Sequence, residues 1–473
     1  MMTGQQVAAQ AQAFFDRGEL RQALARRVAM ATESQDPQGR ESLLRYLQTE
    51  IAPALSAIGF TCELLDNPVQ ADCPFLLAER REGADLPTLL CYGHGDVVFG
   101  QAEHWREGLQ PWTLLEEGDR WYGRGSADNK GQHTINFAAL QQVYQARGGR
   151  LGFNCKILFE MGEEISSPGL AEICLRHRRR LAADIFIASD GPRLNAERPT
   201  LFLGSRGCIN FRLSLRARQQ AYHSGNWGGL LSNPAIQLAN AIACLVNQHG
   251  QIQVSALKPP ALSAGLKALL SDIALEPQPG DPLIDPDWGE AGLSPTERLY
   301  GWNSLEVLSF LAGDPVKPVN AIPPSAAAVC QLRFVVGTDW QACGQHVRRH
   351  LDAHGFEQVE VEVLSSSPAT RFDPESPLVS WALQIIQQAS GKKPALLPNI
   401  GGSLPNEVFA DILQLPTLWI PHSYPACGQH GANEHMLKSI AREGLQIMTR
   451  LFWELGESGK HRVPLCGKDW AER

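Results

Sequence analysis

The sequence lacks any long apolar run. No stretch approaches about 18 consecutive apolar residues, so no transmembrane helix is predicted. The first residues contain no apolar core with a basic flank and no small-residue cleavage site, so we expect no signal peptide. The sequence also has no excess of basic residues. It contains 42 Lys and Arg and 50 Asp and Glu, which give a net charge of −8. This balance argues against a nucleic acid as partner and leaves an ordinary globular protein.

Paired cysteine spacings are also lacking. The 11 cysteines are odd in number and scattered, and none forms a C-x-x-C pair. They are typical of reduced thiols in a cytoplasmic protein rather than of a disulfide framework or a zinc ribbon. The chain has no internal repeat and no low-complexity segment. At 473 residues, of which 44% are hydrophobic, it is long enough for about two or three domains.

Continuous apolar runs, each ending in glycine or polar residues, recur in the first part of the chain and again near its end. They span residues 86–96, 154–164, 182–191 and 415–423. A helical pattern, "NKGQHTINFAALQQVYQARGG", separates the first two runs. Strand–helix alternation with apolar rather than alternating strands favours an α/β domain whose mostly parallel central sheet is covered on both faces.

The middle of the chain has a different pattern. From about residue 205, "CINFRLSLRARQ" and later "AAVCQLRFVVGT" and "QVEVEVLS" alternate apolar with polar residues. Such alternation is typical of an antiparallel sheet with one solvated face. We therefore predict an α+β domain inserted into the α/β domain, with boundaries at 1–204, 205–368 and 369–473.

Acidic residues and histidines gather where the predicted strands end. In an open α/β sheet, ligands bind at the carboxyl ends of the strands, so we expect these side chains to meet at one edge. Two imidazoles with at least three carboxylates form a set that binds zinc and similar divalent metals. Two cations sharing a carboxylate balance so many acids better than one cation does. The residues are His94, Asp96, Asp128, Glu163, Glu164, Asp190 and His430.

Five motifs in this order carry a family resemblance: "GHGDVV", "GRGSADNKG", "GEEISSPG", "SDGP" and "HGANE". Together they resemble the dinuclear-zinc metallopeptidases of the aminoacylase, carnosinase, glutamate carboxypeptidase and acetylornithine deacetylase superfamily. The resemblance covers nearly the whole chain, including "AYHSGNWGG", "NAIPPSAAAVCQLRF" and "GGSLPN". It implies a zinc-peptidase-like catalytic domain with an inserted lid or dimerisation domain.

The resemblance also implies a set of metal ligands. His94, Asp128 and Asp190 would hold one metal, and Asp128, Glu164 and His430 the other, with Asp128 bridging. Two Zn²⁺ per chain are expected, with Co²⁺ or Mn²⁺ as alternatives. His435 follows closely, but only His430 stands in the "HGANE" motif, so His430 is the predicted ligand.

Further roles follow from the same resemblance. Glu163 would be the general base, and Asp96 would orient the ring of His94. The peptide bond between Asp128 and Asn129 would be cis. His223 would reach the active site of a second subunit and stabilise the developing oxyanion, and its alternative is a histidine that caps a turn.

A substrate carboxylate needs a separate site. Arg333 resembles the arginine that binds this carboxylate, together with Gly401, Gly402 and Ser403. An ordinary exposed strand arginine is the alternative, and the sequence "RFVVGTD" lacks the proline often found after the family's arginine. Asn303 is a further predicted substrate contact.

The predicted function is a cytoplasmic, homodimeric hydrolase that cleaves an amide bond next to a free carboxylate by means of a hydroxide bridging two metals. The length favours a dipeptidase or a carboxypeptidase acting on small peptides. The alternative is a deacylase of N-acyl or N-carbamoyl amino acids. A non-catalytic binding module and a phosphoester hydrolase remain as hypotheses from other classes, but all ligand positions are filled and the motifs supply chiefly acids.

Overall fold

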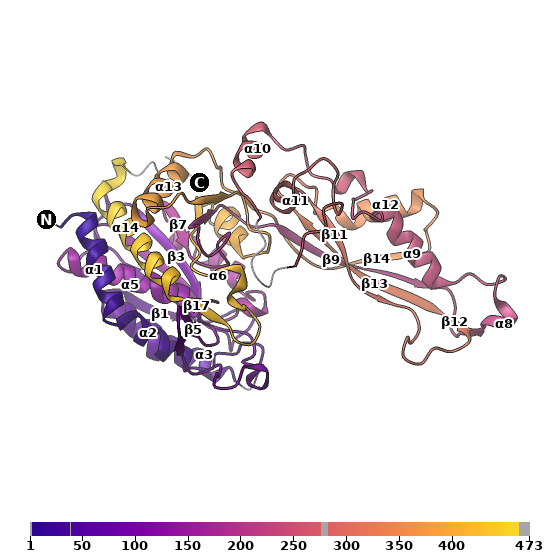
Figure 1. The fold of residues 1–473 in the computed structure, drawn as a ribbon, viewed down its shortest axis with the longest axis horizontal. Coiled ribbons are helices and arrows are strands. Elements are labelled where there is room, and N and C mark those ends of the chain that lie inside the picture. Colours follow the sequence, from indigo (N-terminus) through magenta and orange to yellow (C-terminus); the bar gives the residue numbers. More distant parts are fainter. Residues whose placement is uncertain (1, 38, 276–281, 463–473) are drawn as a thin grey trace. The chain divides into compact units, whose positions relative to one another are not determined.

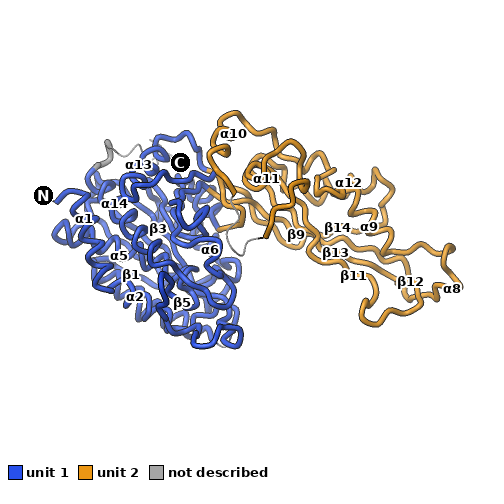
Figure 2. The backbone as a smooth tube through the Cα atoms, in the orientation of Figure 1, with its two compact units in different colours: residues 1–203, 372–397, 405–473 blue, residues 204–371, 398–404 orange. Residues whose placement is uncertain are grey.

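The chain divides into two compact units in the computed structural model (Figure 1, Figure 2). Unit 2 is inserted into unit 1, and a short later segment also belongs to unit 2. Unit 1 comprises residues 1–203, 372–397 and 405–473, and unit 2 comprises residues 204–371 and 398–404. The structure describes residues 2–37, 39–275 and 282–462, so the end of the predicted segment 369–473 lies outside the described residues.

Unit 1 is built on an eight-stranded mixed sheet in the order β1-β2-β6-β3-β7-β16-β8-β15. Its four central strands, β6, β3, β7 and β16, run parallel, and antiparallel pairings occur toward both edges. The predicted α/β class is confirmed. The strands are β1 (Thr61–Leu65), β2 (Phe75–Arg80), β3 (Thr88–His94), β6 (Asn154–Glu160), β7 (Ile185–Ala188), β8 (Thr200–Phe202), β15 (Ala395–Leu397) and β16 (Thr417–Trp419).

Helices from both ends of the chain pack together in unit 1. α5 and α14 are in contact, and α1, α2 and α13 pack against this pair (Figure 1). Nearly every residue of α5 from Lys130 to Leu140 is buried, as expected for a helix enclosed on all sides. The helices are α1 (Gly4–Asp16), α2 (Glu19–Val28), α3 (Glu41–Tyr46), α4 (Ala52–Ser56), α5 (Lys130–Ala146), α6 (Leu170–Arg176), α7 (Arg178–Leu181), α13 (Pro377–Ser390) and α14 (Lys438–Arg462).

A small three-stranded sheet, in the order β17-β5-β4, completes unit 1. It joins β4 (Leu115–Glu117) and β5 (Arg120–Tyr122) to β17 (His435–Leu437), which directly follows the "HGANE" motif. This pairing brings a late segment of the chain next to the loop that precedes α5. Among the described residues, no helix combines the length and the apolar character needed to cross a membrane.

Unit 2 contains a four-stranded antiparallel sheet in the order β11-β13-β9-β14. Buried and partly exposed residues alternate along β13, which matches the predicted sheet with one solvated face. α9 and α12 pack on its buried side. The elements are β9 (Gly207–Arg216), β10 (Tyr222–His223), α8 (Ser224–Trp227), α9 (Pro234–Leu245), α10 (Ala264–Ser271), α11 (Pro295–Gly301), β11 (Ser304–Leu311), β12 (Ala321–Ile322), β13 (Ser325–Phe334), α12 (Cys343–Ala353) and β14 (Glu360–Ser367).

Candidate metal centre

The carboxyl ends of the central strands of unit 1 place the predicted ligands together. His94 is the last residue of β3, and Asp190 follows β7 by two residues. Glu163 and Glu164 begin a short 3₁₀ turn after β6. Because these strands are parallel neighbours, their ends meet at one edge of the sheet. Loops before α5 and before β17 add Asp128 and His430.

Two triads of side chains share the carboxylate of Asp128. His94 Nε2 lies 3.2 Å from Asp128 Oδ1 and 3.5 Å from Asp190 Oδ2. His430 Nε2 lies 3.2 Å from Asp128 Oδ2 and 3.1 Å from Glu164 Oε2. Within each triad, one ligand atom from every residue lies within 4.8 Å of the others. Asp128 therefore presents one oxygen to each triad. The peptide bond that follows it is cis.

The donor atoms of the first triad fit a divalent cation. His94 Nδ1 lies 3.1 Å from the carbonyl oxygen of Asp96, which can only accept, so Nδ1 carries the proton and Nε2 presents its lone pair. Asp190 Oδ2 is buried and has no hydrogen-bond partner among the described residues, and it faces this nitrogen. Lone pairs thus converge on one point, and a cation there would satisfy all of them at once.

The pKa shifts at the centre reflect its excess of carboxylates. Burial alone would lower the pKa of His94, but hydrogen bonds to the surrounding carboxylates raise it well above its ordinary range. Hydrogen bonds to Asp128 and Glu164 raise the pKa of His430 to about 11. Burial raises the pKa of Glu164 to about 7, and that of Glu163 well above its usual range. Bound cations would offset this excess of carboxylates.

The two adjacent glutamates have different surroundings. Glu164 belongs to the second triad through its contact with His430. The carboxylate of Glu163 lies 4.0 Å from His94 Nε2 and belongs to neither triad. Their side chains therefore diverge from a shared turn, and Glu163 lies next to the first triad without belonging to it.

Asp96 fixes the turn that carries both glutamates. Its Oδ1 accepts from the backbone N–H of Glu163 at 3.1 Å, and its Oδ2 accepts from that of Glu164 at 3.0 Å. Oδ1 also lies 3.3 Å from His94 Nδ1, and Ser34 donates to Oδ2 at 2.7 Å. The contact with the imidazole was expected. The hydrogen bonds from the backbone of the two glutamates could not be predicted from a local sequence pattern, because about 67 residues separate the partners.

A buried ion pair, which the sequence patterns did not single out, holds the Asp128 loop. Glu434 accepts from the backbone N–H groups of Gly125, Ala127 and Asp128 at 3.0, 2.9 and 3.0 Å. Arg124 donates to the same carboxylate at 2.7 Å. Glu434 is the last residue of "HGANE", and its position in that motif could have identified it as part of the site. His435 instead pairs with the Tyr424 hydroxyl at 2.7 Å, outside both triads.

Within unit 2, the predicted carboxylate-binding residues come together. Arg333 Nη1 donates to Ser403 Oγ at 2.9 Å, and this hydroxyl donates to the carbonyl oxygen of Arg206 at 2.9 Å. Gly401 and Gly402 directly precede the serine. Arg206 was not anticipated; burial and the nearby Arg333 lower its pKa to about 10. The Arg206 guanidinium donates to Ser304 Oγ and to the carbonyl oxygen of Arg333, each at 3.0 Å, so its charge lies near Arg333.

The remaining two predictions in unit 2 have different outcomes. The amide of Asn303 is buried and donates to the carbonyl oxygen of Leu257 and to Thr338 Oγ1, at 2.7 and 2.9 Å. Both of its N–H groups are thus engaged inside the unit, so it is not free to donate to a substrate. His223 is exposed at the end of β10, and within the described part of the chain its ring makes no hydrogen bond or ion pair.

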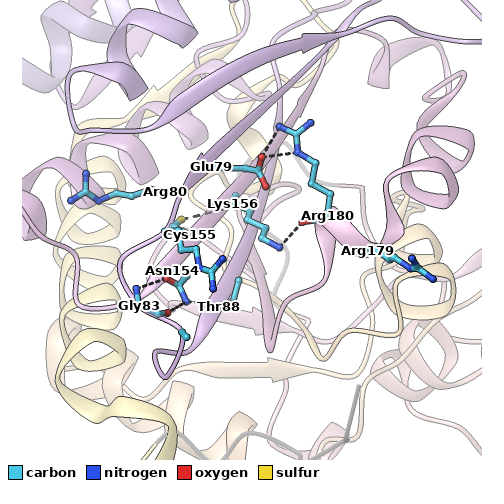
Figure 3. Close-up of a pocket in the computed structure, with 11 residues that line it drawn as sticks. Glu79, Arg80, Gly83, Thr88, Asn154, Cys155, Lys156, Arg179 and Arg180 are labelled. Carbon is cyan, nitrogen blue, oxygen red and sulfur yellow. Dashed lines mark hydrogen bonds and ion pairs between the residues drawn. The ribbon is translucent and has the colours of Figure 1, made fainter. Parts of the chain in front are cut away.

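A basic pocket of about 340 Å³ lies at the opposite edge of the central sheet (Figure 3). Thr88 and Asn154, which begin β3 and β6, line it. Figure 3 shows Arg180 directed at Glu79, and Lys156 donating to the backbone carbonyl of Arg180. Its cations are therefore partly neutralised within the pocket, and it has no part in the metal centre.

The model of Peptidase family M20/M25/M40 matches residues 90–454. The chain belongs to this family. The family prediction made from the five motifs is confirmed, and the protein is an enzyme of the metallopeptidase class. The two triads fit the dinuclear metal site of such peptidases.

Curated relatives span most of the enzyme. The Beta-Ala-His dipeptidase of Mus musculus is 26% identical over 407 residues, which cover 83% of this chain and 82% of the relative. The Cysteinylglycine-S-conjugate dipeptidase of Corynebacterium striatum is 26% identical over 347 residues, with 72% and 74% covered. The Cys-Gly metallodipeptidase DUG1 of Saccharomyces cerevisiae is 25% identical over 402 residues, with 81% and 82% covered.

Solved structures show the same fold. The di-peptidase Dug1p of Saccharomyces cerevisiae has a TM-score of 0.75 at 21% identity, with 96% of this chain and 99% of that chain covered. Human carnosine dipeptidase 1 has a TM-score of 0.74 at 23% identity, with 97% and 99% covered. The mixed sheet with a separate inserted domain is thus the fold of these peptidases.

Proposed function

We propose that the enzyme is a metal-dependent dipeptidase that cleaves the amide bond next to the free carboxylate of a small peptide. The observation that carries this proposal is the pair of triads that share Asp128, each with one imidazole and two carboxylates. The relatives that span most of the chain are named as dipeptidases, which favours dipeptides over N-acyl amino acids as substrates.

In this proposal the triads hold two divalent cations, zinc first, with Co²⁺ and Mn²⁺ as competitors. Bound there, such cations would supply Lewis-acid chemistry, which polarises a scissile carbonyl and lowers the pKa of water so that hydroxide is available as the nucleophile. Glu163, which belongs to neither triad, receives the proton of that water and delivers it to the nitrogen of the leaving amine. Glu164 acts as a ligand. Asp96 positions both glutamates through their backbone.

Unit 2 supplies the group that binds the substrate carboxylate. Arg333 presents a planar guanidinium, which can bind a carboxylate with two parallel hydrogen bonds. Ser403 orients it, and the nearby Arg206 adds a second positive charge. The glycines 401 and 402 allow the backbone to approach the ligand closely. This site selects substrates with a free carboxylate.

We also propose that the enzyme is a homodimer formed through unit 2, which acts as its lid and dimerisation domain. β11 and β14 are the two edge strands of the unit 2 sheet, and both expose large apolar side chains. Monomeric proteins rarely leave such edges uncovered. In the dimer, His223 would serve the active site of the second copy and stabilise the oxyanion. The exposed side chains are Val307, Leu308, Phe310, Leu311, Val363 and Leu364.

The thiols support a reducing compartment, and we propose that the enzyme is cytoplasmic. Ten described cysteines are free, and none of them forms a disulfide. Seven of these ten are buried, where they serve as small apolar side chains.

The test is metal content per chain together with hydrolysis of a mixed panel of dipeptides, N-acyl amino acids and an aryl phosphate, before and after chelation. We expect two metals per chain and release of free amino acids from dipeptides, lost on chelation and restored by zinc. Preferred cleavage of N-acyl amino acids would replace the dipeptidase with a deacylase. Two metals without amide hydrolysis would reject the substrate class.

A further inference from the structure

Unit 2 contains another group of metal-ligating side chains, and none of them belongs to the two triads. Cys244 lies near the end of α9, and His350 and His354 lie one helical turn apart at the end of α12. These two helices pack against each other. One ligand atom from each of the three residues lies within 4.8 Å of the others, the same limit within which each triad of the metal centre falls.

Backbone carbonyls fix the tautomers of both histidines. His350 Nε2 lies 2.9 Å from the carbonyl oxygen of Cys244, and His354 Nδ1 lies 2.7 Å from that of His350. A carbonyl oxygen only accepts, so each of these nitrogens carries a hydrogen. The other nitrogen of each neutral ring then presents a lone pair. Histidines that bind metals typically have this arrangement, in which the second nitrogen donates to a carbonyl or carboxylate.

The two imidazole rings lie close together in a tilted arrangement. Their centroids are 4.2 Å apart with an interplanar angle of 30°. The i, i+4 spacing places both rings on the same face of the helix end. The two carbonyl contacts leave His350 Nδ1 and His354 Nε2 as the ring nitrogens that could bind a metal.

The cysteine determines which metals the group suits. Cys244 is half-buried, and its thiol donates to the carbonyl oxygen of Ala241 at 3.0 Å. Binding of a divalent cation would replace the S–H bond with a metal–sulfur bond and release one proton to solvent. One thiolate with two imidazoles suits zinc and cobalt, whereas calcium and magnesium require oxygen ligands.

We propose that Cys244, His350 and His354 form a separate site in unit 2 for a divalent cation of the zinc class. Three protein ligands leave a fourth coordination position for water or another ligand. The two hydrogen bonds to carbonyls by themselves are also what histidines capping helix ends would make. Capping, however, requires neither the nearby sulfur nor the close approach of the two rings, and it predicts no metal binding.

Cobalt spectroscopy on the full-length protein separates the two explanations. The triads of the metal centre contain no cysteine, so a thiolate-to-cobalt charge-transfer band in the near ultraviolet reports only on a site with sulfur. We expect this band when Co²⁺ is titrated into the metal-free wild-type protein, together with a third equivalent of bound metal. Zinc should abolish the band by displacing the cobalt.

Single substitutions then assign the ligands. Cys244→Ser should remove the band and the third equivalent, while the two equivalents of the metal centre remain. His350→Ala and His354→Ala should each weaken or abolish the band. Cys62→Ser, which changes another half-buried thiol, should leave it unchanged. The proposal is overturned if wild-type protein shows no band, or if the band persists in Cys244→Ser. Loss of thermal stability in the histidine variants without any wild-type band would identify them as helix caps.

Discussion

Arg124 and Glu434 form an ion pair of 2.7 Å in which both side chains are only 1% exposed. The pair lies under the loop of Asp128, since Glu434 also accepts from three backbone N–H groups of that loop. Removal of one partner from a buried pair leaves an uncompensated charge and typically costs about 3–5 kcal/mol. The loop that presents the shared ligand of both triads therefore depends on a residue about 306 positions later in the chain.

Glu434→Gln should lower the free energy of unfolding by about 3 kcal/mol and reduce the metal content below two per chain, because the loop loses its charged acceptor. Urea unfolding and metal analysis measure both effects. Arg124→Met should destabilise by a similar amount. The double variant should lose clearly less free energy of unfolding than the sum of the two single losses, because the two residues interact. Fully additive losses would mean that the pair contributes nothing to the stability of the loop.

Glu163→Gln should keep two metals per chain and lower kcat by about 10²–10⁴-fold, because the amide cannot accept the proton of the nucleophilic water. Glu164→Gln should instead lower the metal content, since Glu164 belongs to a triad. Metal analysis and steady-state kinetics on one dipeptide separate the two variants. Loss of a metal from the Glu163 variant would show that the two glutamates have exchanged roles.

Arg333→Met should lower kcat/KM for a dipeptide by about 10–100-fold, the range expected when a charge-assisted hydrogen bond of about 1.5–3 kcal/mol is lost. The same dipeptide with an amidated C-terminus should be cleaved equally poorly by wild type and variant. Arg212→Met serves as control, because Arg212 is an exposed arginine of the same sheet, paired with Glu362. If the Arg333 and Arg212 variants behave alike, Arg333 is an ordinary strand arginine.

The stability of the protein should depend on pH through Glu407. Its Oε2 atom is buried without a hydrogen-bond partner among the described residues, and burial raises its pKa from 4.5 to about 7. The pKa of this carboxyl group is higher in the folded state than in the unfolded state. Such a group makes its full contribution to the free energy of unfolding only when the pH is below the unfolded-state pKa. That contribution, about 3 kcal/mol, is lost as the pH rises through about 7.

Glu407→Gln should therefore be more stable than wild type at pH 8 and should gain little at pH 4, because the neutral amide needs no proton. Urea unfolding at the two pH values measures the difference. Glu375→Gln, which changes an exposed glutamate of unit 1, should show no such dependence. If the free energy of unfolding changed with pH in the same way for Glu407→Gln and wild type, Glu407 would not be the source of the pH dependence.

The ligands of the metal centre could be predicted from the sequence because local signals place them. An apolar run followed by His94, or by the two glutamates, marks the end of a buried strand, and parallel strands end at one edge. How these residues group into two sets was implied by the family resemblance, and the structure brings each predicted ligand into a triad. Alternating patterns likewise predicted the unit 2 sheet.

Contacts between distant segments could not be predicted in the same way. Patterns over a few residues indicate periodicity, but not which distant backbone a side chain will meet. The bonds of Asp96 to the glutamate turn, the support of Arg333 by Ser403, and the engagement of Asn303 inside unit 2 are all of this kind. The burial of α5 from Lys130 to Leu140 depends on α14, which comes almost 300 residues later.

The position of β16 has a consequence for biosynthesis. This strand lies between β7 and β8 in the central sheet, although more than 200 residues separate it from them along the chain. A nascent chain that has reached residue 416 therefore has a gap in its main sheet and lacks both His430 and the anchor of the Asp128 loop. Ribosomal synthesis delivers all three residues of the first triad within the first 190 residues, whereas the second triad is complete only after His430 has emerged.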